Sequence, residues 1–200
     1  MAAKRITKKQ AAAMREIEQR AAPPARGTAS LPSFADGIAT YLAQTAGAPA
    51  FEHNRITYLP HGKDFFSALL SALKEAKSYI FMEYFIYRPG AMWDPVLEIL
   101  KEKAASGVEV RLIYDDVGSI NYLPRDYSKQ LEAMGIHCIA FNPYKPVYAV
   151  VMNHRDHRKI TVIDGNVAFV GGINLADEYI NVREKHGHWK DTAVRLTGDA

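Results

Sequence analysis

Helical and extended patterns alternate along the middle of this chain, and this alternation limits the folds open to it. Residues 63–77 place large apolar side chains on one helical face, and an apolar run rich in strand-forming residues follows over 78–87. Two further helix–strand pairs are expected, over residues 94–106 with 108–114 and over 127–134 with 136–141. This order predicts an α/β fold in which helices flank a mixed, mostly parallel sheet.

The composition excludes a disordered chain and limits its setting. Of the 200 residues, 48% are hydrophobic and 24% are charged, which is typical of a chain that buries a core. No apolar run approaches the roughly 18 residues that cross a bilayer, and no hydrophobic signal segment follows Met1, so we expect neither a span nor secretion. Cys138 is the single cysteine, and its apolar surroundings predict a buried strand residue in a reducing cytoplasm.

The basic charge is concentrated at the amino terminus. The net charge is +3, but residues 1–20 carry six basic and two acidic side chains, whereas the other 180 residues carry 19 basic and 20 acidic ones. We expect residues 1–30 to form a basic helix or tail with a Pro/Gly linker, and residues 31–200 to form the folded lobe. The basic segment fits an anionic lipid surface or a solvated tail. The nearly neutral remainder argues against nucleic acid as a partner.

Two aspartates follow the expected strand of residues 108–114. Ligands of open α/β sheets bind beside the carboxyl ends of strands, so Asp115 and Asp116 stand where a site can form. Aspartates followed by Gly118 are also typical of a turn in water. We expect a solvated turn here, with a ligand site as the alternative.

A hairpin is expected after residue 156. Asp164, Gly165 and Asn166 separate two runs of β-branched residues, so residues 157–163 and 167–170 should pair as antiparallel strands. Alternation along the first strand places His157 and Lys159 on one face. Asp164 stands at an odd offset from His157, which makes it a poor partner for the imidazole. Its carboxylate is better suited to accept backbone N–H groups at the turn.

A histidine beside a lysine is suited to phosphoryl transfer. The imidazole can attack phosphorus while the ammonium neutralises the phosphate oxygens without a metal. The turn after the second strand brings Gly172 and Asn174 to the same end, where backbone N–H groups and an amide can approach a phosphate. The alternative is an ordinary solvated sheet face that carries both residues.

The segment His157-Arg158-Lys159 through Asp164 resembles the His-x-Lys-x4-Asp motif of the phospholipase D superfamily. Further stretches are similar to the bacterial cardiolipin synthases, over residues 83–86, 107–119, 168–179 and 188–192. The resemblance covers about residues 55–198, with the phosphodiesterase motif at about residues 152–179. It implies a phospholipase D-like lobe.

The resemblance also implies roles for individual residues. His157 would be the nucleophile or the proton-transferring histidine, Lys159 would bind phosphate, and Asp164 would support the geometry of the motif. Asn174 and Gly172 would contact the substrate. Asp191 would accept a hydrogen bond from the second ring nitrogen of His157 and so fix its tautomer.

No metal or cofactor is implied by the resemblance. The histidines near the motif are therefore interpreted as anion-binding or surface residues, namely His154, His186 and His188. The implied reaction joins two phosphatidylglycerol molecules into cardiolipin and glycerol through a phosphatidyl-histidine intermediate. It places the enzyme at the cytoplasmic face of the cell membrane, although this chain contains no membrane segment of its own.

The motif occurs once, whereas enzymes of the superfamily use two. One histidine attacks while the other protonates the leaving alkoxide. Three hypotheses follow from the single motif. The chain is the amino-terminal part of a cardiolipin synthase that is inactive alone, or two copies form a symmetric phosphodiesterase or nuclease, or the chain is a non-catalytic half-domain. The first is preferred, because the details of the motif match the lipid enzymes.

Overall fold

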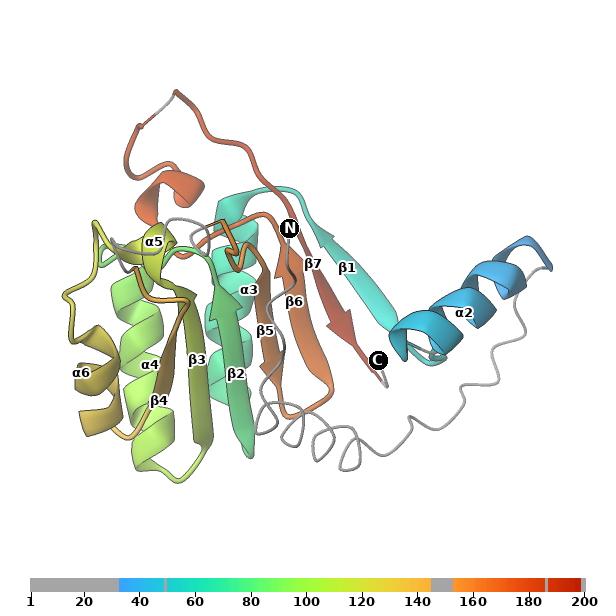
Figure 1. The fold of residues 1–200 in the computed structure, drawn as a ribbon, viewed down its shortest axis with the longest axis horizontal. Helices are drawn as coiled ribbons and strands as arrows, with labels where there is room; N and C mark the ends of the chain where they lie inside the picture. Colours follow the sequence, from blue (N-terminus) through green and yellow to red (C-terminus); the bar gives the residue numbers. More distant parts are fainter. Residues whose placement is uncertain (1–32, 49, 145–152, 186, 199–200) are drawn as a thin grey trace, which may run out of the picture. The chain divides into compact units, whose positions relative to one another are not determined.

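The computed structural model describes residues 33–48, 50–144, 153–185 and 187–198, and these divide into two compact units (Figure 1). The first unit ends at His53, and its described helix is α2 (Ser33–Ala46). The second unit runs from Asn54 and contains every described strand. The expected basic helix and linker of residues 1–30 lie outside the described residues, and the boundary near residue 31 stays a prediction.

One mixed sheet forms the second unit, in the order β1-β7-β6-β5-β2-β3-β4. Its strands are β1 (Arg55–Leu59), β2 (Tyr79–Tyr84), β3 (Glu109–Asp115), β4 (His137–Phe141), β5 (Lys159–Ile163), β6 (Val167–Gly171) and β7 (Ala193–Thr197). The helical elements are α3 (Gly62–Glu75), α4 (Trp93–Ala105), α5 (Asp116–Ser119), α6 (Tyr127–Ala133) and the 3-10 helix η2 (Asp177–Ile180). The predicted α/β fold with a mixed sheet and flanking helices is confirmed.

The expectation that most strands would be parallel is wrong. β2 pairs with β3, and β3 with β4, in parallel, while the other four neighbouring pairs are antiparallel. Parallel pairing is confined to the helix–strand repeats, because each crossover helix returns the chain in the same direction. The strands β5, β6, β7 and β1 form an antiparallel half. The alternation of helices and strands along the chain did not predict this half, of which only the β5–β6 hairpin was expected, from its turn.

The predicted hairpin is present, but its first strand is shorter than expected. β5 and β6 pair in antiparallel register around the turn at Asp164, where φ is 52°, and Gly165, where φ is 73°. The strand begins at Lys159 rather than at residue 157. The backbone N–H of Arg158 donates to the Asp156 carboxylate, which removes that donor from the ladder.

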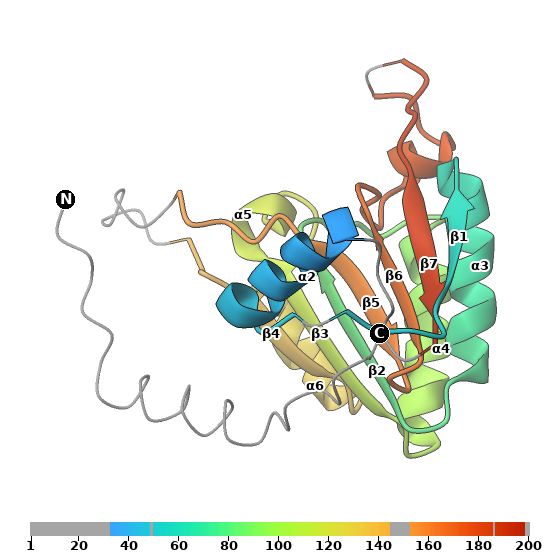
Figure 2. The ribbon, with the colours of Figure 1, turned by 90° about the vertical axis from the view of Figure 1, so that its right-hand side faces the viewer.

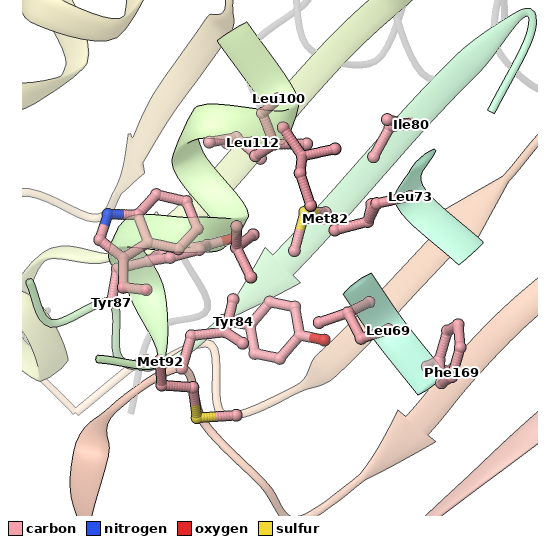
Figure 3. Packing of buried hydrophobic residues seen from close by; sticks show 14 of the residues in the cluster. Leu69, Leu73, Ile80, Met82, Tyr84, Tyr87, Met92, Leu100, Leu112 and Phe169 are labelled. Atoms are coloured by element: carbon pink, nitrogen blue, oxygen red, sulfur yellow. The ribbon is translucent and has the colours of Figure 1, made fainter. Parts of the chain in front are cut away.

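Helices α3 and α4 cover one face of the sheet, as two views a quarter-turn apart show (Figures 1 and 2). Figure 3 shows the contact, with Leu69 and Leu73 of α3 beside Ile80 and Met82 of β2. All four are at most 2% exposed. Burying each such side chain stabilises the fold by about 1.5–3 kcal/mol. Cys138 is also buried in β4, as predicted, and burial raises the pKa of its thiol to about 12.

The topology brings several strand ends to one edge of the sheet. β2 and β3 are parallel, and β5 runs antiparallel to β2, so the start of β5 lies beside the carboxyl ends of β2 and β3 (Figure 1). Tyr84 at the end of β2 is in register with Lys159 at the start of β5. This edge therefore carries the residues expected to perform chemistry.

Candidate phosphoryl-transfer site

His157 lies directly before β5 and is exposed to solvent. Its ring packs against Phe85, with 4.7 Å between the ring centroids and 56° between the planes. Phe85 follows β2, so the aromatic support comes from the neighbouring strand. The contact limits the orientations of the imidazole and leaves the ring open to a ligand.

Lys159 lies next to His157 and is only 5% exposed. Its ammonium donates a hydrogen bond to the backbone carbonyl of His157 and lies 5.3 Å from the centroid of the Phe85 ring. Burial lowers the pKa of Lys159, and the carboxylates of Asp191 and Asp156 partly oppose this shift. A buried ammonium held against the backbone of His157 supplies positive charge beside the imidazole, as electrostatic stabilisation of a phosphate requires.

Asp164 lies at the opposite end of β5 from His157. Its carboxylate accepts hydrogen bonds from three consecutive backbone N–H groups, those of Lys77 at 2.8 Å, Ser78 at 2.7 Å and Tyr79 at 2.9 Å. Burial alone would raise its pKa, but these donors outweigh burial and hold the pKa below its ordinary value. The carboxylate therefore ties the hairpin turn to the start of β2, in agreement with the parity argument. Any part in the reaction stays a prediction.

Gly172 and Asp191 are packed tightly together. A Cβ atom on Gly172 would lie 2.2 Å from Oδ1 of Asp191, so any larger residue here requires the Asp191 side chain to move. The same oxygen accepts a hydrogen bond from the Thr192 N–H at 2.8 Å. Among the residues that the structure describes, no hydrogen bond joins Asp191 to His157. The expected carboxylate–imidazole contact and the substrate contact of Gly172 stay predictions, while Asp191 acts electrostatically on Lys159.

Asn174 is buried, at 2% exposure, and both ends of its amide have protein partners. Its Oδ1 accepts from the Ile86 N–H at 3.0 Å, and its Nδ2 donates to the Tyr179 hydroxyl at 2.6 Å. The amide thus joins the loop after β2 to η2, at the edge that carries His157. Its predicted contact with phosphate stays a prediction, and its observed contacts are structural.

The expectation of a solvated turn is wrong for Asp115. This residue is fully buried at the end of β3, and its carboxylate accepts from the Gly118 N–H, from Arg155 and from the Asp156 N–H. The segment that leads to His157 is therefore anchored to the carboxyl end of β3. No residue near Asp115 in the sequence indicated this burial, because its partner Arg155 lies 40 residues later.

The described residues show no group of three or more His, Cys, Asp or Glu side chains arranged to hold a metal ion. His154 and His188 are exposed, and His186 lies outside the described residues. As for membranes, no helix in the described part of the chain has both the length and the apolar character of a bilayer span.

Comparison with known proteins identifies relatives of this site. Residues 69–186 match the family described as "Cardiolipin synthase, PLD-like domain". A cardiolipin synthase of Oceanobacillus iheyensis is 37% identical over 149 residues, which are 74% of this chain and 31% of that protein. The major cardiolipin synthase ClsA of Bacillus subtilis is 38% identical over 151 residues, again 74% of this chain and 31% of that protein. An uncharacterised protein of Streptococcus mutans is 48% identical over 162 residues, 81% of this chain and 35% of that protein.

Solved structures share the fold at low sequence identity. NucT from Helicobacter pylori has a TM-score of 0.53 at 16% identity, covering 73% of this chain and 86% of that chain. Phosphatidylserine synthase from Haemophilus influenzae has a TM-score of 0.57 at 15% identity, covering 72% of this chain and 33% of that chain. The Nuc protein of Salmonella typhimurium, a phospholipase D family member, has a TM-score of 0.50 at 18% identity, covering 72% of this chain and 82% of that chain.

The chain spans about a third of the length of the curated relatives it matches. Within that third lie the single His-x-Lys-x4-Asp motif and the sheet edge that carries it. The family match covers more than half of the chain, and the phospholipase D fold agrees with it. The chain therefore belongs to the phospholipase D-like domain family of the cardiolipin synthases.

Proposed function

We propose that this lobe supplies one half of the active site of a phosphatidyltransferase that makes cardiolipin from two phosphatidylglycerol molecules. The observation that supports it is the pairing of an exposed imidazole with a buried ammonium, His157 with Lys159, at one edge of the sheet. Both residues contact Phe85, so the nucleophile and the positive charge share one support.

The chemistry proceeds in two displacements at phosphorus. A ring nitrogen of His157 attacks the phosphodiester of the first phosphatidylglycerol, and the P–O bond to its glycerol headgroup breaks. The departing alkoxide takes a proton and leaves as glycerol. The hydroxyl of a second phosphatidylglycerol then attacks the phosphatidyl-histidine, gives up its proton, and releases cardiolipin and the free imidazole. Lys159 stabilises the charge on the phosphate oxygens in both steps.

A second proton-transferring group is required for both steps. It must protonate the first alkoxide and deprotonate the acceptor hydroxyl, and the motif occurs once in the 200 residues. We therefore infer that the chain is inactive as a transferase by itself, and that a second lobe completes the site. Membrane association at the cytoplasmic face follows from the lipid substrate and from the basic residues within positions 1–20.

One observation favours a second candidate, in which two copies complete each other. The match to NucT covers 86% of that chain and the match to Nuc covers 82%, so a lobe of this size forms most of a chain in other proteins of the fold. In that case the substrate is a phosphodiester reached by a symmetric pair of motif histidines, and water is the acceptor.

The two candidates are separated by measuring oligomeric state and substrate together. The purified chain and its His157→Ala variant are sized by gel filtration and incubated with phosphatidylglycerol vesicles and with plasmid DNA. A fusion that joins this chain to the remaining part of the Bacillus subtilis ClsA relative is assayed in parallel. We expect a chain inactive on both substrates and a fusion that forms cardiolipin and loses this activity with His157→Ala.

A dimer that cleaves DNA in a manner dependent on His157 would refute the transferase proposal. A trapping experiment tests the intermediate separately. Phosphatidylglycerol labelled at phosphorus should transfer label to the fusion protein as an acid-labile, base-stable adduct. If the wild-type protein carries no label under conditions of turnover, the phosphatidyl-histidine intermediate is excluded.

A further inference from the structure

On the face of the sheet opposite α3 and α4, the carboxyl group of Glu83 lies among apolar side chains. Glu83 of β2 is in register with Ile113 of β3 on one side and with Ile160 of β5 on the other. Phe81 and Phe85 stand two residues before and after it, and alternation directs them to the same face. The Glu83 side chain is 21% exposed. Its polar partners must therefore come from the segment that precedes β5.

Those partners are the two residues that flank His157. Nη2 of Arg158 lies 2.7 Å from Oε1 of Glu83, and Nε of Arg158 donates to Oδ1 of Asp156 at 3.1 Å. Oδ1 of Asp156 also accepts the backbone N–H of Arg158 at 3.2 Å, so both carboxyl groups contact the same arginine. Through Arg158 and Asp156 this cluster of Glu83, Asp156 and Arg158 holds the backbone on both sides of His157.

The charge balance of this cluster favours a proton. Two carboxyl groups share one guanidinium, and two like charges at one site disfavour ionisation of both. Burial raises the pKa of Glu83 to about 7, and the neighbouring Asp156 adds to the shift while Arg158 opposes it. Burial also acts to raise the pKa of Asp156, but the hydrogen bonds from Glu83 and Arg158 outweigh it and lower the pKa. The proton therefore resides on Glu83.

The charged groups on the neighbouring strands are engaged elsewhere. The titratable or charged groups that share this face are Glu109, Arg111 and Asp115 on β3 and His137 on β4. Arg111 donates to Glu109 and lies over the Phe81 ring, His137 lies 3.5 Å from Glu132, and Asp115 accepts from Arg155. Among the described residues, Arg158 is thus the cation that contacts Glu83, and the proton is the second neutralising charge.

We propose that Glu83 is a positioning residue, whose protonated carboxyl locks Asp156 and Arg158 and so sets the orientation of His157 for attack on phosphate. Loss of that proton leaves two carboxylates with one guanidinium, and their repulsion loosens the contacts that both make with Arg158. The His157 backbone is then held on one side less firmly, and the ring moves from its support on Phe85. This inference rests on the proposed function for its catalytic consequence, but the switch itself belongs to the lobe.

The test follows the carboxyl group and the imidazole by NMR during a pH titration of the full chain. Side-chain carboxyl carbons of glutamate and ring nitrogens of histidine are labelled, and the Glu83 and His157 signals are assigned from their loss in Glu83→Gln and His157→Ala. We expect the Glu83 carbon to titrate near neutral pH and the His157 ring signals to shift in the same transition. Glu83→Gln, which keeps a neutral hydrogen-bonding group, should remove the part of the His157 signal shift that accompanies the titration of Glu83.

Glu109→Gln is the matched control, because Glu109 is an exposed carboxylate on β3 that also contacts an arginine. It should leave the His157 titration unchanged. A Glu83 carbon that titrates near the ordinary value of 4.5 would overturn the inference, and so would a His157 titration that is identical in wild type and Glu83→Gln. The pKa of Glu83 itself is measured in the wild-type chain, and the variants serve for assignment and comparison. None of these readouts requires catalysis, so a failure to form cardiolipin would refute the proposed function and leave this inference standing.

Discussion

Replacing Asp164 should destabilise the lobe without touching the chemistry at the other end of β5. In Asp164→Ala, three backbone N–H groups lose their carboxylate acceptor. A hydrogen bond to a charged group contributes roughly 1.5–3 kcal/mol when it is protected from solvent. The bonds from Lys77 and Ser78 are exposed, where water replaces the acceptor, so each contributes on the order of 0.5 kcal/mol, and the part-buried bond from Tyr79 contributes about 1–2 kcal/mol.

The backbone adds a further cost in alanine. Asp164 has a φ of 52°, a conformation that aspartate and asparagine tolerate better than alanine. We therefore expect Asp164→Ala to lose roughly 2–4 kcal/mol in the free energy of unfolding. Asp164→Asn keeps an oxygen for Ser78 and Tyr79 and should lose about 1 kcal/mol. Equilibrium unfolding in urea, followed by tryptophan fluorescence, measures both losses.

The dependence on pH supplies the decisive comparison for this carboxylate. The folded-state pKa of Asp164 is depressed below its ordinary value of 3.8, so its stabilisation is fully present above that pH and is lost as pH falls through the folded-state pKa. The stability difference between wild type and Asp164→Asn should therefore shrink below about pH 4. Asp126→Asn is the control, because Asp126 is an exposed aspartate directly before α6. Its free energy of unfolding should stay within about 0.5 kcal/mol of that of wild type. An Asp164→Ala variant that unfolds with the wild-type midpoint would refute the structural role.

Three further predictions concern the edge that carries His157. Gly172→Ala places a Cβ 2.2 Å from Oδ1 of Asp191, so the Asp191 carboxylate must move. Calorimetry should show a loss of about 1–3 kcal/mol, and the transfer activity of the fusion protein should fall. Wild-type melting would contradict this. Lys159→Met removes a buried ammonium, so the melting temperature should be unchanged or higher. Transfer activity should fall roughly 100-fold or more. Activity close to that of wild type would exclude Lys159 as the phosphate-stabilising charge. Because the pKa of Glu83 is raised, the stabilisation from its protonated form is complete below about pH 4.5 and is lost as pH rises through about 7. From pH 5 to pH 8 the free energy of unfolding of Glu83→Gln should therefore rise relative to wild type by on the order of 1 kcal/mol, after allowance for solvent screening. Urea unfolding at the two pH values measures this change, and a constant difference would contradict it.

Local patterns were sufficient for the elements whose partners are close in sequence. Periodicity in residues 63–77 and the turn at Asp164 predicted α3 and the β5–β6 hairpin, because both depend on contacts within a few residues. The pairing of β1 with β7 joins Arg55 to Thr197, and no local signal in either strand identifies its partner. The pairings of β7 with β1 and with β6 could therefore not be predicted from local patterns.

The site was predictable in its chemistry and less so in its supports. Spacing alone placed His157 and Lys159 together, and the structure brings them into contact through a hydrogen bond to the backbone. The burial of Asp115 was not predictable, because it depends on Arg155 arriving from 40 residues later along the chain. The contacts of Glu83 were missed for the same reason. Its partners are the residues on either side of His157, more than 70 positions from the strand that carries Glu83.

The residues of the motif therefore divide by what they contact, and this division changes how loss of activity must be interpreted. His157 is exposed, and the ammonium of Lys159 lies against the backbone of His157. Asp164 and Asn174 instead use their polar atoms to join separate segments of the fold. A variant of Asp164 or Asn174 that loses activity has lost a connection between segments before any contact with substrate is considered. Activity measured at a temperature where the variant is fully folded separates the two causes. At that temperature a structural residue should recover most of its activity, and His157→Ala should recover none.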